Sequence, residues 1–126
     1  MESLPELISW VNTHLDDHVS EVYKDQPLAQ DWARVAKASE EVGEAIDALI
    51  GVTGQNPRKG TYGTLDDLYD ELADVALTAM YAIAHFENDI DVLHIINKRS
   101  QYHKDRILKM GVKEFLLQGS SNQREI

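Results

Sequence analysis

Apolar residues recur at intervals of three and four along most of the chain, which is the spacing of one face of an α-helix. The clearest stripe covers residues 32–50, and a second one covers residues 65–83. An earlier stripe follows Ser3-Leu-Pro-Glu6, which has the pattern of a capping box with proline at an early helical position. A fourth stripe is expected to end by Gly111. No segment alternates like a strand, so we predict an all-α bundle of four main helices.

Polar or glycine-rich segments separate these stripes. A turn is expected around residues 25–27 and a break near residues 88–89. The longest separator, residues 51–63, contains four glycines and one proline, which indicates an exposed loop. Thr64, directly after this loop, is typical of a helix N-cap.

Five carboxylates interrupt the two clearest stripes: Glu40, Glu41, Glu44, Glu71 and Asp74. Successive residues of an α-helix are about 100° apart, so a spacing of three leaves two side chains roughly 60° apart on one face. Glu41 and Glu44 therefore share a face, as do Glu71 and Asp74. If the two helices pack side by side, these acidic groups converge on a small volume. Their mutual repulsion then favours a bound cation.

An all-oxygen ligand set in a chain without cysteine is typical of a Mg²⁺ site, in which Mn²⁺ can substitute. Such an ion can neutralise a polyphosphate and lower the pKa of a bound water, which a neighbouring carboxylate then deprotonates. The sequence therefore predicts hydrolysis of a phosphoanhydride. Residues 51–63 do not have the glycine and Gly-Lys-Ser/Thr spacing of a Walker phosphate loop, so phosphate binding is expected to depend on the metal.

Composition narrows the class of partner. The chain of 126 residues carries a formal net charge of -10, which opposes sequence-independent binding to nucleic acid or to an anionic membrane. It has no cysteine, no apolar run of membrane-spanning length and no signal-peptide pattern in its first residues. We therefore expect a cytoplasmic protein that has neither a nucleic acid nor a membrane as its partner.

The length allows one domain with a modest core. We expect residues 1–118 to form a single all-α domain and residues 119–126 to form a flexible tail. Four helices in so short a chain bury limited apolar area. A homodimer or homotetramer is therefore expected to complete the core.

At the acidic motifs the chain resembles a known family, the all-α nucleoside triphosphate pyrophosphohydrolases, also called MazG-like proteins. Their signature is Glu-x-x-Glu, a spacer and then Glu-x-x-Asp. Here Glu41-Val-Gly-Glu44 and Glu71-Leu-Ala-Asp74 supply both halves, and Glu40 reproduces a doubled glutamate in front. The resemblance implies a MazG-like fold and cleavage of a (deoxy)nucleoside triphosphate between the α and β phosphates. The products are the monophosphate and pyrophosphate, and some members prefer dUTP or dCTP.

The same resemblance implies a role for each of the five acidic residues. Glu41, Glu44, Glu71 and Asp74 match the positions that hold Mg²⁺ in the family. Glu40 is assigned either as the base that orients the attacking water or as a further ligand. All five are therefore predicted catalytic residues.

Residues outside the acidic motifs are predicted to bind the substrate. Several relatives stack an aromatic residue that precedes the first motif on the base, and the resemblance implies this role for Trp32. Such stacking contributes about 1–3 kcal/mol at other nucleic-acid sites. Arg58 and Lys59 lie in the glycine-rich loop, from which they are predicted to close over the phosphates.

The last predicted helix carries the remaining substrate-binding candidates. The family presents an Asn followed by basic residues there, and Asn97-Lys98-Arg99 is similar to this pattern. One turn later Tyr102 stands where the family pattern has Arg, and it completes the predicted substrate-binding set.

Other interpretations stay open at these positions. Acidic runs on helices are most often solvated faces, and Trp32 also suits a core or interface anchor. A competing hypothesis is a non-catalytic acidic helical module that binds a basic partner. His14 and His18 are four residues apart, as in helical metal pairs, but Leu15 replaces the glutamate of the metalloprotease motif. We therefore interpret both histidines as surface or packing residues.

Overall fold

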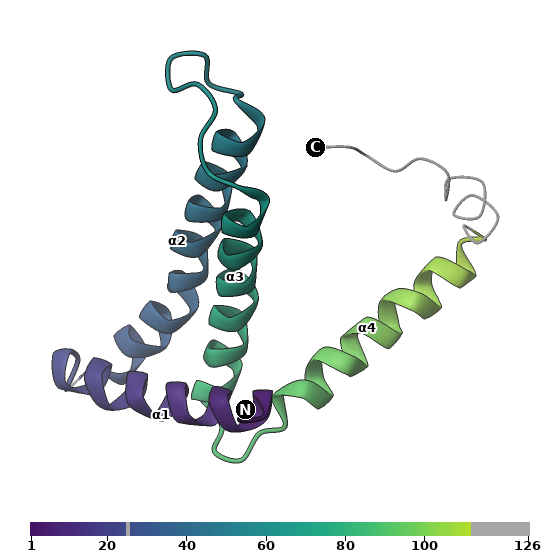
Figure 1. Ribbon diagram of the computed structural model, residues 1–126. Coiled ribbons are helices and arrows are strands. Elements are labelled where there is room, and N and C mark those ends of the chain that lie inside the picture. Colours follow the sequence, from purple (N-terminus) through teal and green to yellow (C-terminus); the bar gives the residue numbers. More distant parts are fainter. Residues whose placement is uncertain (25, 112–126) are drawn as a thin grey trace. The chain divides into compact units, whose positions relative to one another are not determined.

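The computed structural model describes residues 1–24 and 26–111, and every regular element within these ranges is an α-helix (Figure 1). The helices are α1 (Leu4–Val22), α2 (Pro27–Thr53), α3 (Leu65–Phe86) and α4 (Val92–Lys109). The predicted all-α class with four main helices is confirmed. The tail predicted for residues 119–126 lies outside the described residues.

The chain divides into two compact units. The first unit, Met1–Ile90, contains α1, α2 and α3. The second begins at Asp91, and its described part consists of α4 and the residues that flank it. The single domain predicted for residues 1–118 stays a prediction. No helix within the described ranges is long and apolar enough to cross a membrane.

The starts of α1 and α3 are fixed by reciprocal caps. Ser3 Oγ accepts a hydrogen bond from the backbone N–H of Glu6, and Glu6 Oε2 accepts one from the backbone N–H of Ser3. Thr64 and Asp67 make the equivalent pair at the start of α3. Each pair satisfies two backbone donors that have no partner inside the helix, and both predicted helix starts are confirmed.

The end of α2 differs from the predicted boundary. The helix continues through Gly51 to Thr53 and ends at Gly54, whose φ of 66° is the left-handed conformation of a helix C-cap. Gly51 is needed for a close contact instead of a turn, because Tyr62 donates its backbone N–H to the Gly51 carbonyl at 2.8 Å. A Cβ at Gly51 would lie 2.5 Å from the Tyr62 ring. The glycine therefore lets the following loop fold back onto the helix.

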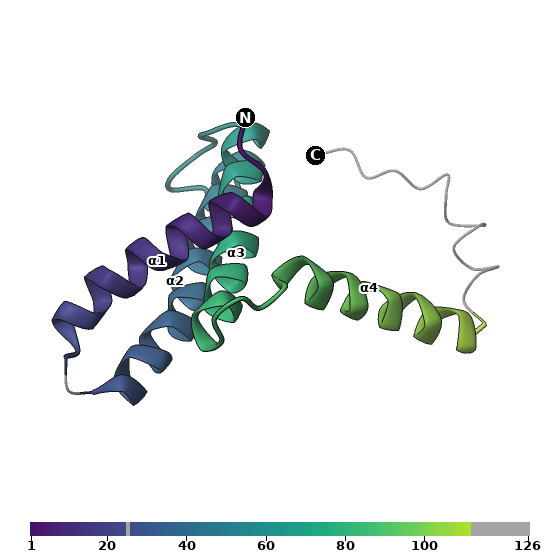
Figure 2. The same ribbon diagram turned by 90° about the horizontal axis from the view of Figure 1, so that it is seen from below.

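Within the first unit, α2 and α3 run antiparallel and side by side, and α1 lies across them (Figures 1 and 2). Ala45 of α2 and Ala82 of α3 are both buried, and these small side chains permit a close approach of the helices. The side-by-side packing of the two acidic helices, on which the convergence of their carboxylates depends, is therefore present.

The buried apolar core of the described residues is small. It consists of Ile8, Ala45, Leu68, Ala82 and Val92. None of the described side chains is less than 2% exposed, so even these residues lie near the surface. The first unit therefore has a limited interior of its own.

Candidate metal and substrate site

The contact between α2 and α3 brings three of the predicted acidic residues together. Glu41, Glu44 and Glu71 each offer one carboxylate oxygen, and these oxygens all lie within 4.8 Å of one another. Glu41 and Glu44 are one turn apart on α2, and Glu71 approaches them from α3. We call these three residues the acidic cluster.

Part of the acidic cluster is withdrawn from solvent. The Glu41 side chain is 13% exposed, and Glu71 Oε2 is buried with no hydrogen-bond partner among the described residues. A buried polar atom without a partner costs about 1–3 kcal/mol, so such atoms are normally hydrogen-bonded or bound to a ligand. Glu71 Oε2 is therefore the atom of the cluster that most requires a partner.

The surroundings raise the pKa of Glu41. Burial is the largest cause, because it disfavours the ionised form of a carboxylate. The charge of Glu44 and a hydrogen bond with it raise the pKa further, as does the charge of Asp74, whereas Lys37 acts in the opposite direction. A cation among these oxygens would favour the ionised form instead.

Glu40 points to a different partner. Its side chain is 60% exposed, and its Oε2 accepts a hydrogen bond from Lys37 Nζ at 2.8 Å. This hydrogen bond is the largest cause of the raised pKa of Lys37. Lys37 Nζ also lies 3.7 Å from Glu41 Oε1. Lys37 therefore lies at the edge of the acidic cluster, between it and Glu40.

Asp74, the fourth predicted metal ligand, lies one turn after Glu71 on α3 and is exposed. It does not belong to the three-residue cluster, but its charge raises the pKa of Glu41. Burial and then the charge of Asp74 also raise the pKa of Tyr81. Asp74 is thus close enough to influence both groups electrostatically.

A pocket of about 620 Å³ lies between α1 and the α2–α3 pair, and Glu41 and Asp74 are both in its wall. Lys37 and Arg34 add two cationic side chains to this wall, and His18 and Tyr81 add further polar groups. Its aliphatic lining consists of Val11, Leu15, Val19, Val22, Ala33 and Leu77. Small-molecule sites of roughly 300–1,000 Å³ commonly combine such apolar walls with a few polar groups.

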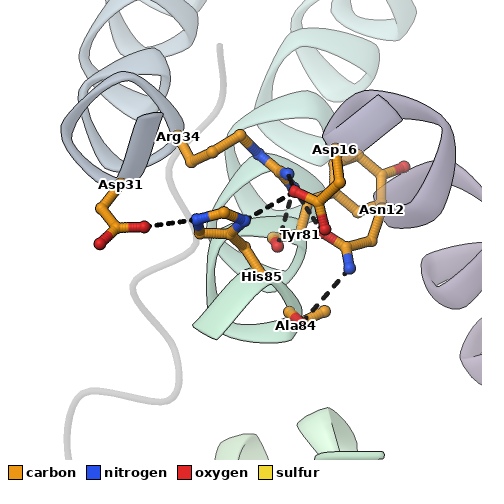
Figure 3. Close-up of polar contacts among 7 residues, drawn as sticks. All are labelled: Asn12, Asp16, Asp31, Arg34, Tyr81, Ala84 and His85. Carbon is orange, nitrogen blue, oxygen red and sulfur yellow. Dashed lines mark hydrogen bonds and ion pairs between the residues drawn. The ribbon is translucent and has the colours of Figure 1, made fainter. Parts of the chain in front are cut away.

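Arg34 is the centre of a second polar group, which joins α1, α2 and α3 (Figure 3). The side chain is 5% exposed, and its Nη1 donates to Asp16 Oδ1. Its Nη2 donates to Asn12 Oδ1 at 2.6 Å and to the Tyr81 carbonyl at 3.0 Å. Asn12 Nδ2 in turn donates to the Ala84 carbonyl at 3.3 Å.

His85 extends this network from the last turn of α3. Its Nδ1 lies 2.6 Å from Asp16 Oδ1 and its Nε2 lies 2.7 Å from Asp31 Oδ1. The ring therefore connects α1 to the first turns of α2 (Figure 3). We call Asn12, Asp16, Asp31, Arg34 and His85 the arginine network. Burial lowers the pKa of Arg34, while the charge of Asp16 and the hydrogen bond with it act in the opposite direction.

Sequence reasoning missed the arginine network. A signal was present, because Arg34 precedes Glu41 by seven residues and so lies on nearly the same face of α2. A charged residue on the inward face of a helix requires buried partners. Those partners come from α1 and α3, and sequence spacing within α2 does not identify them.

The predicted substrate residues of the first unit lie on exposed surface. Trp32 is 72% exposed and is not in the wall of the pocket. Arg58 is exposed in the loop after α2, and Lys59 Nζ lies 3.7 Å from Asp47 Oδ1. Their predicted contacts with a nucleotide stay predictions.

The other predicted substrate residues lie on α4, in the second unit. Asn97, Lys98, Arg99 and Tyr102 are all exposed. The Arg99 guanidinium carbon lies 4.2 Å from the centre of the Tyr102 ring, a cation–π contact between neighbouring turns. Their predicted role toward the phosphates stays a prediction as well.

Comparisons of the chain with protein-family models, curated proteins and solved structures gave no match.

Proposed function

We propose that this protein is a Mg²⁺-dependent nucleoside triphosphate pyrophosphohydrolase. It cleaves a (deoxy)nucleoside triphosphate between the α and β phosphates and releases the monophosphate and pyrophosphate. The observation that carries the proposal is the convergence of Glu41, Glu44 and Glu71 beside a pocket large enough for a small molecule. The reaction itself is inferred from the resemblance of the two acidic motifs to the MazG-like signature.

The residues present fit a hard divalent cation. The acidic cluster offers only carboxylate oxygens, which are the ligands that Mg²⁺ and Mn²⁺ prefer. Glu71 Oε2 has no other partner among the described residues. Glu41, Glu44, Glu71 and Asp74 would hold the ion. When bound, Mg²⁺ supplies positive charge for the phosphate oxygens and makes a nearby water more acidic.

The reaction requires an acceptor for one proton. A water oxygen forms a bond to the α phosphorus, and the bond from that phosphorus to the bridging oxygen breaks, so that the electron pair leaves with pyrophosphate. We assign Glu40 as the carboxylate that accepts the water proton. Lys37 Nζ, which lies 2.8 Å from Glu40 Oε2 and 3.7 Å from Glu41 Oε1, connects this carboxylate to the cluster.

Two kinds of side chain in the pocket are suited to different parts of the substrate. Its aliphatic walls, mainly from α1, can receive the nucleoside and exclude water from the reacting bond. Lys37, at the polar end, places a positive charge next to the acidic residues and offsets part of the phosphate charge. The shape of the aliphatic wall therefore decides which base and sugar are accepted.

The proposal also includes the substrate preference, the cellular compartment and the oligomeric state of the enzyme. We propose clearance of dUTP, dCTP or a non-standard nucleotide in the cytoplasm by a homodimer or homotetramer. The small core of the described residues supports self-association, because four helices of this length leave much apolar surface unburied.

A screen of common and modified nucleoside triphosphates tests the activity. The purified full chain is incubated with each triphosphate and Mg²⁺, and pyrophosphate, phosphate and monophosphate are quantified together. We expect equal amounts of monophosphate and pyrophosphate and no free phosphate. Glu44→Gln and Asp74→Asn should lose the activity, whereas Glu87→Gln, at an exposed position after α3, should retain it.

The competing hypothesis of a non-catalytic acidic module predicts a different outcome. Under that hypothesis no triphosphate is cleaved, and a slowly hydrolysed triphosphate analogue with Mg²⁺ leaves the melting temperature unchanged. The enzyme should instead be stabilised by that combination, because the ligand binds only the folded state. Wild-type turnover by Glu44→Gln would also contradict the assigned site.

A further inference from the structure

Helix α1 presents its apolar stripe to the pocket instead of to a packed core. Of its residues, all of which the structure describes, only Ile8 is buried. Val11, Leu15, Val19 and Val22 follow at intervals of four and three, so they share one face of the helix, and all four line the pocket. The apolar side chains that normally hold a helix in place therefore border a space of about 620 Å³.

Two polar residues on a neighbouring face connect α1 to the other helices (Figure 3). Asn12 and Asp16 each follow a pocket-lining residue by one position, so they lie about 100° around the helix from the pocket wall. Asn12 Oδ1 accepts from Arg34 Nη2 at 2.6 Å, and Asn12 Nδ2 donates to the Ala84 carbonyl at 3.3 Å. Asp16 accepts from the same arginine and lies 2.6 Å from His85 Nδ1. These contacts join α1 to both α2 and α3.

The partners of these two residues adjoin the pocket. Arg34 is in the pocket wall, and its Nη2 also donates to the carbonyl of Tyr81, another wall residue, at 3.0 Å. The Arg34 side chain is 5% exposed, so water does not readily replace a lost partner. A shift of α1 away from the other helices would therefore leave a buried guanidinium partly unpaired, which opposes the shift.

Hydrogen bonds fix the position of a helix more narrowly than apolar contacts do. They require a donor and an acceptor about 2.7–3.2 Å apart in a nearly straight line, whereas the hydrophobic effect is non-directional. Ile8, Asn12 and Asp16 follow one another at intervals of four, about one turn each, and thus attach α1 at three successive turns. These attachments direct the helix across the α2–α3 pair (Figure 2). The pocket-lining residues beyond them, Val19 and Val22, take their position from this direction.

We infer that Asn12 and Asp16 are positioning residues, which hold α1 at a fixed distance from the α2–α3 pair and thereby set the width of the pocket. They act on a ligand only through the aliphatic wall. Their role toward the substrate rests on the proposed function, in which this wall receives the nucleoside. A wall at a fixed distance discriminates between nucleosides of different size, so these two residues determine selectivity among bases and sugars.

The distance between α1 and α3 tests the positioning role without any substrate. The chain has no cysteine, so Glu21→Cys on α1 and Asp66→Cys on α3, two exposed positions, each accept one nitroxide label. Double electron–electron resonance measures the distribution of distances between the two labels. Unlabelled protein is added in excess, so that only distances within one chain contribute. We expect a narrow distribution in the labelled chain and a clearly broader one after Asn12→Ala.

Two matched controls accompany Asn12→Ala. Thr13→Ala changes the next residue of α1, which is exposed. Asp31→Asn changes a member of the arginine network on α2 whose contact is with His85 of α3, so it leaves the attachment of α1 unchanged. Both controls should keep the narrow distribution. An equally narrow distribution for Asn12→Ala would overturn the inference, as would equal broadening by Asn12→Ala and Thr13→Ala.

Asn12→Ala removes no charge, and Arg34 keeps Asp16 as its ion partner. Asp16→Asn is the milder variant for the case in which Asn12→Ala does not fold. It keeps an acceptor oxygen for Arg34 and removes only the charge. Asp16→Asn should broaden the distribution to a smaller extent, and a distribution identical to that of the unsubstituted chain would contradict the positioning role.

Steady-state kinetics of the full chain with Mg²⁺ test the consequence for the substrate. Asn12→Ala should raise KM for the preferred triphosphate about three- to tenfold, the equivalent of roughly one hydrogen bond, and leave kcat nearly unchanged. The ratio of kcat/KM between the preferred and the poorest triphosphate should fall by a similar factor. A purely structural role would instead lower kcat through a smaller folded fraction, with KM and selectivity unchanged.

These two measurements separate a failure of the positioning role from a failure of the proposed function. If the wild type cleaves no triphosphate, the proposed function is wrong, and the distance distributions still decide whether Asn12 positions α1. If the wild type is active and Asn12→Ala has the wild-type KM and selectivity, the positioning role toward the substrate is wrong and the proposed function stands.

Discussion

The first unit contains two clusters of charged side chains that differ in how their charge is balanced. In the arginine network, Asp16 accepts from Arg34 Nη1 and lies 2.6 Å from a nitrogen of His85. In the acidic cluster, carboxylate oxygens lie within 4.8 Å of one another. The cation beside them, Lys37, is half exposed and lies closest to Glu40. The first cluster pairs its charged groups with one another, whereas in the second Glu71 Oε2 is buried without a hydrogen-bond partner among the described residues.

This difference separates a cluster whose polar groups are paired from one with an unpartnered oxygen. Buried charge by itself does not indicate function, because a paired and hydrogen-bonded group such as Arg34 can serve to hold helices together. An unpartnered buried oxygen such as Glu71 Oε2 stores a cost that a bound cation would remove. Substitutions in the two clusters should therefore change stability in opposite directions.

The largest expected effect comes from breaking the arginine network. Arg34→Met keeps much of the side-chain volume but removes every donor, which leaves Asp16 and Asn12 partly buried without their partner. Removing one member of a buried ion pair typically lowers the free energy of unfolding by about 3–5 kcal/mol. Urea denaturation monitored by circular dichroism measures this loss.

Arg58→Met is the matched control for that experiment, because Arg58 is exposed in the loop after α2. Its effect should stay within about 0.5 kcal/mol. A loss of less than about 1 kcal/mol for Arg34→Met would mean that the network contributes no more than ordinary surface contacts, and the contrast between the two clusters would disappear.

Glu71→Gln should raise the free energy of unfolding of the metal-free protein, whereas Arg34→Met lowers it. The substitution removes one negative charge and gives the orphaned position an amide donor, which adds a hydrogen bond of about 0.5–1.5 kcal/mol to the free energy of unfolding. The variant should also lose stabilisation by Mg²⁺, which for the wild type reaches about 2.7 kcal/mol at a concentration of 100 times Kd. Thermal unfolding with EDTA and with Mg²⁺, alongside Glu87→Gln, measures both effects.

A destabilised Glu71→Gln variant in EDTA would show that the acidic cluster is balanced without a cation. If this variant kept the wild-type response to Mg²⁺, the ion would bind elsewhere. Either result would weaken the assignment of the acidic cluster as a metal site.

Sequence reasoning located the acidic cluster because its information is local. A spacing of three placed Glu41 and Glu44 on one face, and the caps at Ser3 and Thr64 fixed where two helices begin. The apolar stripes predicted the two helices that carry these carboxylates. The prediction that a loop begins at Gly51 was wrong. A glycine is required there because Tyr62, eleven positions later, packs against it, and local sequence does not indicate that contact.

The arginine network and the pocket could not be derived in the same way. Asp16 reaches Arg34 from α1, and His85 reaches Asp16 and Asp31 from the end of α3. These pairings depend on how α1 crosses the other two helices, which intervals of three and four within one helix do not encode. Local patterns therefore predicted the charged group on two adjacent helices and missed the group shared by three.

A smaller effect should appear in the pH dependence of the metal-free protein. Because the pKa of Glu41 is raised by burial and by Glu44, the folded state binds more protons than the unfolded state between the ordinary and the raised pKa. Stability from this group therefore increases as the pH falls through that window and is lost as the pH rises through the folded pKa. Glu41→Gln should remove this component. The measurement is urea denaturation in EDTA at several pH values above 4, compared between the two proteins.

In that comparison the carboxylates away from the cluster titrate in both proteins, so the difference between wild type and Glu41→Gln reports on Glu41 together with its interaction with Glu44. Parallel pH profiles for the two proteins would show that folding does not raise the proton affinity of the Glu41–Glu44 pair. The acidic cluster would then not be crowded enough to require a cation, which would remove its distinction from the arginine network.

The smallest effect concerns Asp47, a carboxylate on the turn after Glu44 that has partners of its own. Tyr62 Oη donates to Asp47 Oδ1 at 2.9 Å, and this hydrogen bond is the main cause of the raised pKa of Tyr62. The folded state keeps the phenol proton to higher pH than the unfolded state. The contribution is therefore complete below the ordinary tyrosine pKa of about 10 and is lost as the pH rises through the folded value.

Tyr62→Phe should accordingly lower the melting temperature slightly at neutral pH and leave Mg²⁺ stabilisation unchanged, since Asp47 is satisfied by neighbours and is not part of the acidic cluster. The difference from wild type should shrink above pH 10, where the phenol ionises. If Tyr62→Phe impaired stabilisation by Mg²⁺, the acidic cluster would extend along α2 by one turn to Asp47. Asp47 would then have to be counted with Glu41, Glu44 and Glu71, because its local partners would not suffice to balance its charge.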